Sequence, residues 1–116
     1  MPYIKSNDGR RESLKQGDIA RTAGELNYQI FYHVKCVKEN TIDISIEKIK
    51  LYVAQFIGLC PNYQRYNDLT GALIRCGIEI KRRLNIDANF LIDILKSYDE
   101  EIANYEDLKI AENGDV

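Results

Sequence analysis

The sequence has few of the residues on which metal and catalytic sites depend. Its 116 residues include one histidine, His33, three cysteines and no tryptophan. A structural zinc site takes four Cys or His ligands with close pairwise spacing, whereas Cys36, Cys60 and Cys76 are far apart and lie among apolar residues. We therefore expect reduced, buried thiols in a cytosolic protein, with no metal and no cofactor.

Catalytic constellations are also missing. His33 and Cys36 have helical spacing, but nothing around them supplies an oxyanion hole or a group that orients the imidazole. The acidic pairs Glu100-Glu101 and Glu106-Asp107 are sequence neighbours, which point about 100° apart on a helix and form no acid–base dyad. No glycine-rich phosphate loop is present. We expect a protein that is not an enzyme.

Long apolar runs and a strong charge of one sign are absent as well. No run approaches the ~18 residues of a membrane span, and the N-terminus lacks the basic and apolar regions of a signal peptide. The net charge is −2, from 16 basic and 18 acidic residues, whereas nucleic-acid-binding domains usually have a basic excess. We expect a soluble, cytoplasmic protein with neither a membrane nor a nucleic-acid partner.

Apolar residues recur at helical spacing in four stretches. The first helix follows Thr22 and Glu25, which have the spacing of a capping box, and ends at residues 40–41. The second is predicted over about 45 to 57, with Ser45 as N-cap and Gly58 as the stop. Its beginning is ambiguous, because isoleucines at 42, 44 and 46 alternate with polar residues as in a strand.

The third stretch has the strongest helical period, from residues 62 to 84, and Lys81-Arg82-Arg83 complement the dipole at its C-terminal end. Asn85 is its predicted terminator. The fourth helix is predicted after Asp87 as N-cap, with an apolar stripe that extends to Ile102. These patterns predict a mainly α fold, a small four-helix bundle-like domain that comprises residues 1–116.

The two ends of the chain are predicted to be less regular. Residues 1–20 are expected to form a mostly irregular arm with one helical turn at 11–15, and Met1–Ile4 a short extended segment. The tail, residues 105–116, fits a helix from Tyr105 to Glu112 with Gly114 as a left-handed cap. It also fits an extended segment that pairs with Met1–Ile4 of this chain or another, since Asn-Gly is a strong hairpin signal.

Four motifs together carry a resemblance: "MPYI" at residues 1–4, "GELNY" at 24–28, "NYQRYNDLTGAL" at 62–73 with "KRR" at 81–83, and "YEDLKIAENGDV" at 105–116. With them the chain resembles a group of small bacteriophage and prophage proteins of no established activity. The resemblance implies a phage context, a small helical domain and the cytoplasm of a bacterial host. Residues 84–104 depart from the pattern as an inserted amphipathic segment, which either closes the bundle or changes how chains associate.

The start of the third helix is the candidate ligand site. Tyr63, Arg65, Tyr66 and Asn67 combine aromatic rings, a guanidinium and an amide at a helix N-terminus, where free N–H groups favour anions. An arginine fork matches phosphate geometry, and a tyrosine ring can stack on a base. This set would suit a nucleotide-type ligand. The alternative is that the tyrosines edge the core while Arg65 and Asn67 are solvated.

A candidate interface follows on the same helix. Gly71, Ala72, Cys76 and Gly77 are small, and small side chains let helix backbones approach closely, either within the bundle or between two chains. We expect a homo-oligomer with Gly71, Ala72, Arg75 and Tyr105 at its interface.

Two functions are consistent with these features. The first is a phage-encoded, non-enzymatic binding protein that counters bacterial anti-phage defence by sequestering a nucleotide immune signal. The second is an inhibitor or adaptor that docks on a host defence protein through its acidic last helix, or a structural or assembly protein of the phage.

Overall fold

The structure is a computed structural model that describes residues 9–39, 45–59 and 61–113, and this part of the chain is helical with no strand. Its elements are α1 (Arg10–Lys15), α2 (Ala23–Glu39), α3 (Ile46–Leu59), α4 (Tyr63–Leu84), α5 (Asn89–Lys96) and α6 (Asp99–Asn113). The predicted class, a mainly α, small bundle-like domain, is confirmed.

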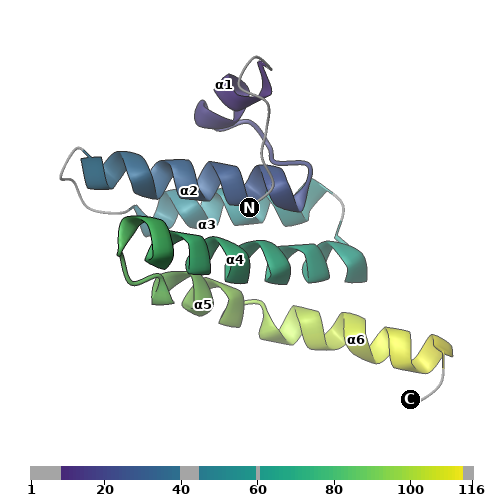
Figure 1. Ribbon diagram of the computed structural model, residues 1–116. Helices are drawn as coiled ribbons and strands as arrows, with labels where there is room; N and C mark the ends of the chain where they lie inside the picture. The colour runs from purple at the N-terminus through teal and green to yellow at the C-terminus, as the bar shows by residue number, and fades with distance from the viewer. Residues whose placement is uncertain (1–8, 40–44, 60, 114–116) are drawn as a thin grey trace.

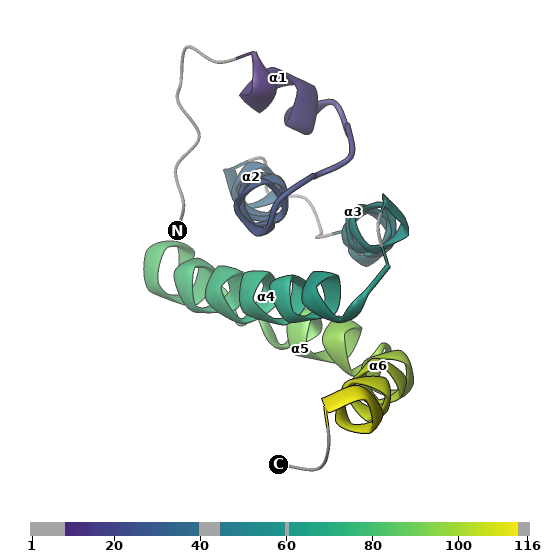
Figure 2. The ribbon, with the colours of Figure 1, turned by 90° about the vertical axis from the view of Figure 1, so that its right-hand side faces the viewer.

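Helix α4 is the centre of the arrangement. It lies between a layer formed by α2 and α3 and a layer formed by α5 and α6, while α1 covers the far side of α2 (Figures 1 and 2). Helices α2 to α5 each turn an apolar stripe toward the core. The largest completely buried apolar side chains are Phe56, Leu14, Leu26, Ile30, Ile49, Leu69, Leu73, Ile80 and Leu91.

The predicted N-caps Thr22 and Ser45 form, whereas the N-cap of α5 is Ala88 and not the predicted Asp87. The Thr22 hydroxyl accepts the Glu25 backbone N–H at 3.1 Å, and the Ser45 hydroxyl accepts that of Lys48 at 3.2 Å. Helix α4 stops at Asn85, which has a left-handed backbone with φ 54°. Asparagine tolerates this conformation better than most residues, so the chain turns there toward α5.

Two predicted boundaries are wrong. Helix α3 continues through Gly58 to Leu59, because a glycine stops a helix only where the backbone turns left-handed. The fourth helix is broken in two at Ser97, whose hydroxyl donates to the Ile94 carbonyl at 2.5 Å and competes with the helical hydrogen bonds. The break redirects the chain so that Tyr98 of the turn and Ile102 and Tyr105 of α6 pack against the core.

The segment before α2 is packed against the core, and the helical turn predicted at 11–15 is present as α1. Leu14 and Ala20 are completely buried. The Gln29 side-chain amide donates to the carbonyls of Leu14 and Asp18, both at 2.9 Å, and so ties α1 and its following turn to α2. The predicted extended segment Met1–Ile4 lies outside the described residues.

The tail is a helix as far as Asn113, within α6. The helical prediction for Tyr105 to Glu112 is therefore confirmed, and the extended alternative is wrong for these residues. The predicted cap at Gly114 lies outside the described residues. None of the helices in the described ranges is long and apolar enough to cross a membrane.

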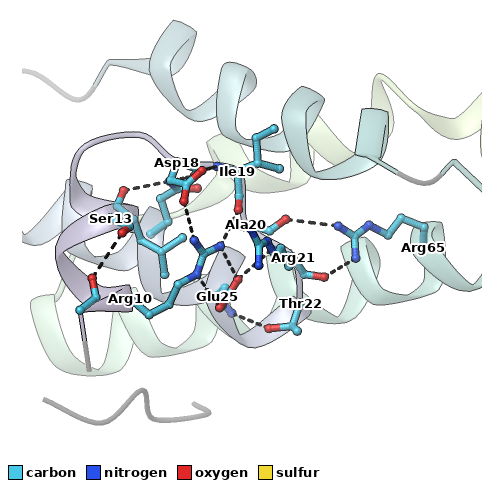
Figure 3. A network of polar contacts seen from close by, with 12 residues as sticks. Arg10, Ser13, Asp18, Ile19, Ala20, Arg21, Thr22, Glu25 and Arg65 are labelled. Atoms are coloured by element: carbon cyan, nitrogen blue, oxygen red, sulfur yellow. Dashed lines mark hydrogen bonds and ion pairs between the residues drawn. The ribbon is translucent and has the colours of Figure 1, made fainter. Parts of the chain in front are cut away.

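An ion-pair network fixes the turn that leads into α2 (Figure 3). Arg10 donates to both carboxylate oxygens of Glu25 at 2.7 Å and to Asp18 at 2.6 Å. Glu25 also accepts the Arg21 backbone N–H at 2.8 Å, which completes the capping pattern one residue before Thr22. The hydrogen bond from Arg10 lowers the pKa of Glu25, and those from the Ile19 backbone and Arg10 lower the pKa of Asp18.

The network predicts a specific acid sensitivity. Since the pKa of Glu25 is lower in the folded than in the unfolded chain, its stabilisation is present above the unfolded pKa of ~4.5 and is lost as the pH falls through the folded value. We expect Glu25→Gln to reduce the free energy of unfolding by about 1.5–3 kcal/mol at pH 7, and by less at pH 3. Urea denaturation at both pH values measures this. Glu47→Gln, at an 88% exposed side chain, is the matched control, and an equal loss at both pH values would contradict the assignment.

Candidate functional site

Arg65, the centre of the predicted ligand site, is a structural residue. Its guanidinium donates to the carbonyls of Phe56 at 2.8 Å, Arg21 at 2.6 Å and Ala20 at 3.2 Å. The planar group lies 3.6 Å from the centre of the Phe56 ring, and the residue is only 9% exposed. Figure 3 shows it reaching from α4 to the turn before α2. The prediction of Arg65 as a ligand-binding residue is wrong, because backbone carbonyls take its donors.

Tyr66 is also interior. Its ring centre lies 5.3 Å from that of Tyr105 and 6.2 Å from that of Tyr98, so the start of α6 covers it. Burial raises the pKa of Tyr66. A buried ring cannot stack on a base, and the prediction of Tyr66 as a ligand residue is wrong. Tyr66 instead fits the alternative prediction, in which the tyrosines of this segment lie at the edge of the core.

Tyr63 and Asn67 remain at the surface but do not form one site. Tyr63 lines a hollow of about 370 Å³ between the start of α4 and α6, together with Asn62, Gln64, Tyr105, Leu108, Lys109 and Glu112. Asn67 is exposed on the outer side of α4 and does not line this hollow. The four predicted residues are therefore distributed over the interior, the hollow and the outer side of α4.

The hollow is poorly suited to a phosphate. The cation in its lining, Lys109, is 3.7 Å from Glu112 of the same lining. The amide N–H of Arg65 at the start of α4 already donates to the Asn62 side chain at 2.8 Å. A phosphorylated ligand would meet one compensated cation and a carboxylate, so the hollow gives an anion little net attraction.

The predicted interface residues also do not lie on one common surface. Ala72 is 4% exposed and belongs to the core, so it is not available for contact between chains as predicted. Tyr105 is half-buried against Tyr66 and also lines the hollow beside α6. The close helix approach occurs inside the chain at Gly77, where an added Cβ would lie 3.6 Å from Ala88. Gly71 and Arg75 are exposed on the outer side of α4.

An apolar groove between α4 and α5 was not predicted. It measures about 720 Å³ and is lined by Ile74, Gly77, Ile78, Lys81, Arg82, Asp87, Ala88, Asn89 and Ile92. Its isoleucines are 45%, 49% and 38% exposed in sequence order. The signal was present in the sequence, because Ile74 and Ile78 stand four apart and fall outside the apolar stripe of α4.

Helix α6 is a second distinctive surface. It carries six acidic side chains and Lys109, and none of its residues is buried. Leu108 is 57% exposed and Ile110 is 47% exposed. Its last turns extend past the start of α4 (Figure 1), so the contacts that hold α6 are made by its first half.

The side chain of His33 accepts a hydrogen bond at the start of α3. The His33 Nε2 accepts the Ser45 backbone N–H at 3.3 Å, and desolvation lowers the pKa of His33. Burial raises the pKa of Cys76 to about 12, so its thiol stays protonated at neutral pH. Within the described ranges, no group of three His, Cys, Asp or Glu residues is placed to hold a metal ion.

Comparison with known proteins adds no relative. No protein-family model, curated protein or solved structure matches the chain. The functional argument therefore rests on the charge, exposure and packing of these surfaces.

The structural role of Arg65 is testable. Arg65→Met would leave three carbonyls without their donor, and an unsatisfied buried acceptor costs ~1–3 kcal/mol. We expect the free energy of unfolding to fall by about 3 kcal/mol, measured by urea denaturation followed by circular dichroism. The control Lys50→Met, at a half-exposed cation of α3, should change it by less than ~0.5 kcal/mol. A loss below ~1 kcal/mol for Arg65→Met would contradict the role.

Proposed function

We propose that this chain is a non-enzymatic binding protein that docks on a positively charged surface of another protein through α6. The observation that carries the proposal is the composition of α6: six acidic residues against one lysine, with no buried residue in fifteen. In the phage context that the sequence resemblance implies, the partner is a protein of the bacterial host, and an anti-defence role follows as part of the proposal.

The charge of α6 supports contact with a basic partner. Its formal charge is −5, whereas the whole chain has −2. Carboxylates at Asp99, Glu100 and Glu101 complement the dipole of the helix start. Glu106, Asp107 and Glu112 have no such role within the chain and face solvent. Charges of one sign on a projecting helix steer a partner of opposite sign and raise its association rate.

The exposed apolar residues of α6 would supply the apolar contact area that charged side chains alone do not provide. Leu108 and Ile110 are more than 45% exposed near the projecting end, and Leu108 lines the hollow beside Tyr63 and Tyr105. Aromatic and aliphatic side chains at the centre of a polar patch are the groups that carry binding energy at protein interfaces. A partner side chain that enters the hollow would bury them together.

The nucleotide alternative has weaker support. It requires a guanidinium and stacking rings at the start of α4, but Arg65 and Tyr66 are interior. The acidic side chains of α6 beside the hollow would also repel a phosphate. The docking proposal needs only groups that are exposed.

Neutralisation of α6 tests the proposal. We expect the triple variant Glu106→Gln, Asp107→Asn, Glu112→Gln to weaken capture of the host partner by the immobilised chain at least tenfold, because it removes three of the charges that attract it. Leu108→Ser should also weaken it, whereas Leu51→Ser, at a 53% exposed leucine of α3, should not. Capture should decrease between roughly 50 and 500 mM salt as screening increases.

Two outcomes would overturn the proposal. One is capture of the same host protein, at the same strength, by the wild type, the triple variant and Leu108→Ser. The other is calorimetric binding of a nucleotide in the micromolar range that Tyr63→Ala removes, since that would restore the sequestering function.

A further inference from the structure

We infer that the outer side of α4 is the contact face for a second copy of this chain, arranged as an antiparallel helix pair about a two-fold axis between Ile74 and Arg75. The inference does not depend on the proposed function of α6. Here "outer face" means the exposed residues of α4 at helical spacing together with the half-buried Asp68, that is Gln64, Asn67, Asp68, Gly71, Ile74, Arg75, Ile78, Lys81 and Arg82.

The outer face is apolar at its centre, where most exposed helix faces are polar. Ile74 and Ile78 are nearly half exposed, and Ile92 of α5 extends the apolar surface beside them. Exposed apolar residues scattered singly need no explanation, whereas a contiguous set beside a groove marks an interaction site.

The missing side chain at Gly71 makes the outer face complementary in shape to the same face of a second copy. A Cβ added at Gly71 would meet nothing within 4 Å, so no packing inside the chain requires a glycine there. Glycine in a helix interior costs about 1 kcal/mol relative to alanine. With the axis between Ile74 and Arg75, Gly71 lies opposite the partner's Ile78. The missing side chain forms a hole for that isoleucine, and this happens twice by symmetry.

Charge is complementary in the same register. Asp68 lies opposite the partner's Lys81, and an antiparallel pair makes this contact twice. Arg75 near the axis is partly compensated within its own chain, because the carboxylate of Glu79 lies 3.5 Å from Arg75 and 2.8 Å from Arg82. The shared carboxylate reduces the repulsion between the arginines of two copies that approach each other. A parallel pair would place Lys81 beside the partner's Lys81.

The size of the face predicts a weak dimer. Helix α4 has 22 residues, so it is about 33 Å long and 10 Å wide, which with α5 gives roughly 450 Å² in projection. Stable interfaces bury ~800 Å² of accessible surface per partner. We expect a dissociation constant in the micromolar range, with both α6 helices still exposed because α6 covers a different side of α4.

Sedimentation velocity of the full chain between roughly 5 and 500 μM tests the dimer. We expect the mass to rise from 13.4 kDa toward twice that value. Gly71→Leu fills the hole and should weaken association at least tenfold. Gly58→Leu is the matched control, since Gly58 is also exposed within a helix with nothing near an added Cβ, and it should leave association unchanged.

A charge exchange tests the register. Asp68→Lys alone and Lys81→Asp alone should each weaken the dimer about fivefold, because like charges then face each other across the interface. The double exchange recreates the pair in reverse and should restore the dissociation constant to within about twofold. A monomer at every concentration, a Gly71→Leu chain that dimerises like wild type, or a double exchange no better than its single variants would each overturn the inference.

Discussion

The arrangement of the helices depends on one buried guanidinium. Arg65 joins the end of α3, through the Phe56 carbonyl, and the turn before α2, through those of Ala20 and Arg21, to the start of α4. Burying a charge is costly unless its hydrogen bonds are made, so these segments are held where their carbonyls meet it. The same contacts remove the residue that looked best suited to bind a phosphate. The proposed function therefore uses other residues of the surface.

The sequence predicts the helices well because their signals are local. The stripes of α2 and α4, the caps at Thr22 and Ser45, and the left-handed stop at Asn85 each depend on residues within one or two turns. The errors come from tertiary packing. Gly58 continues a helix because nothing turns the chain there, and the fourth stripe is continuous in sequence although Ser97 divides it. Leu14 and Ala20 lie in a polar stretch, and the part played by Gln29 in tying their segment to α2 is not a local signal.

The candidate site was harder to predict for a physical reason. An arginine in the first turn of a helix has the same local sequence whether its side chain faces solvent or backbone carbonyls 44 residues away, as with Arg21. The helical phase does indicate which side of α4 each residue occupies, since Arg65 lies beside the buried stripe while Ile74 and Ile78 lie opposite it. Phase assigns a residue to a side of its helix, and only the packing of α5 and α6 decides which sides stay exposed.

The two exposed faces differ in charge, and this difference separates their roles. Because the chain has −2 in total and α6 alone has −5, all other residues together have +3. A face with one sign of charge repels its own copy, so α6 is suited to a different protein. The outer face of α4 carries charges of both signs, with Asp68 among its cations and Glu79 paired to both arginines, and it is apolar at its centre, which suits an identical partner. A dimer formed there would carry two acidic helices. Once one helix has bound, the second binds a neighbouring site at a high effective concentration, so the overall affinity would increase. Weak association through α4 could thus strengthen docking through α6 without any change in α6 itself.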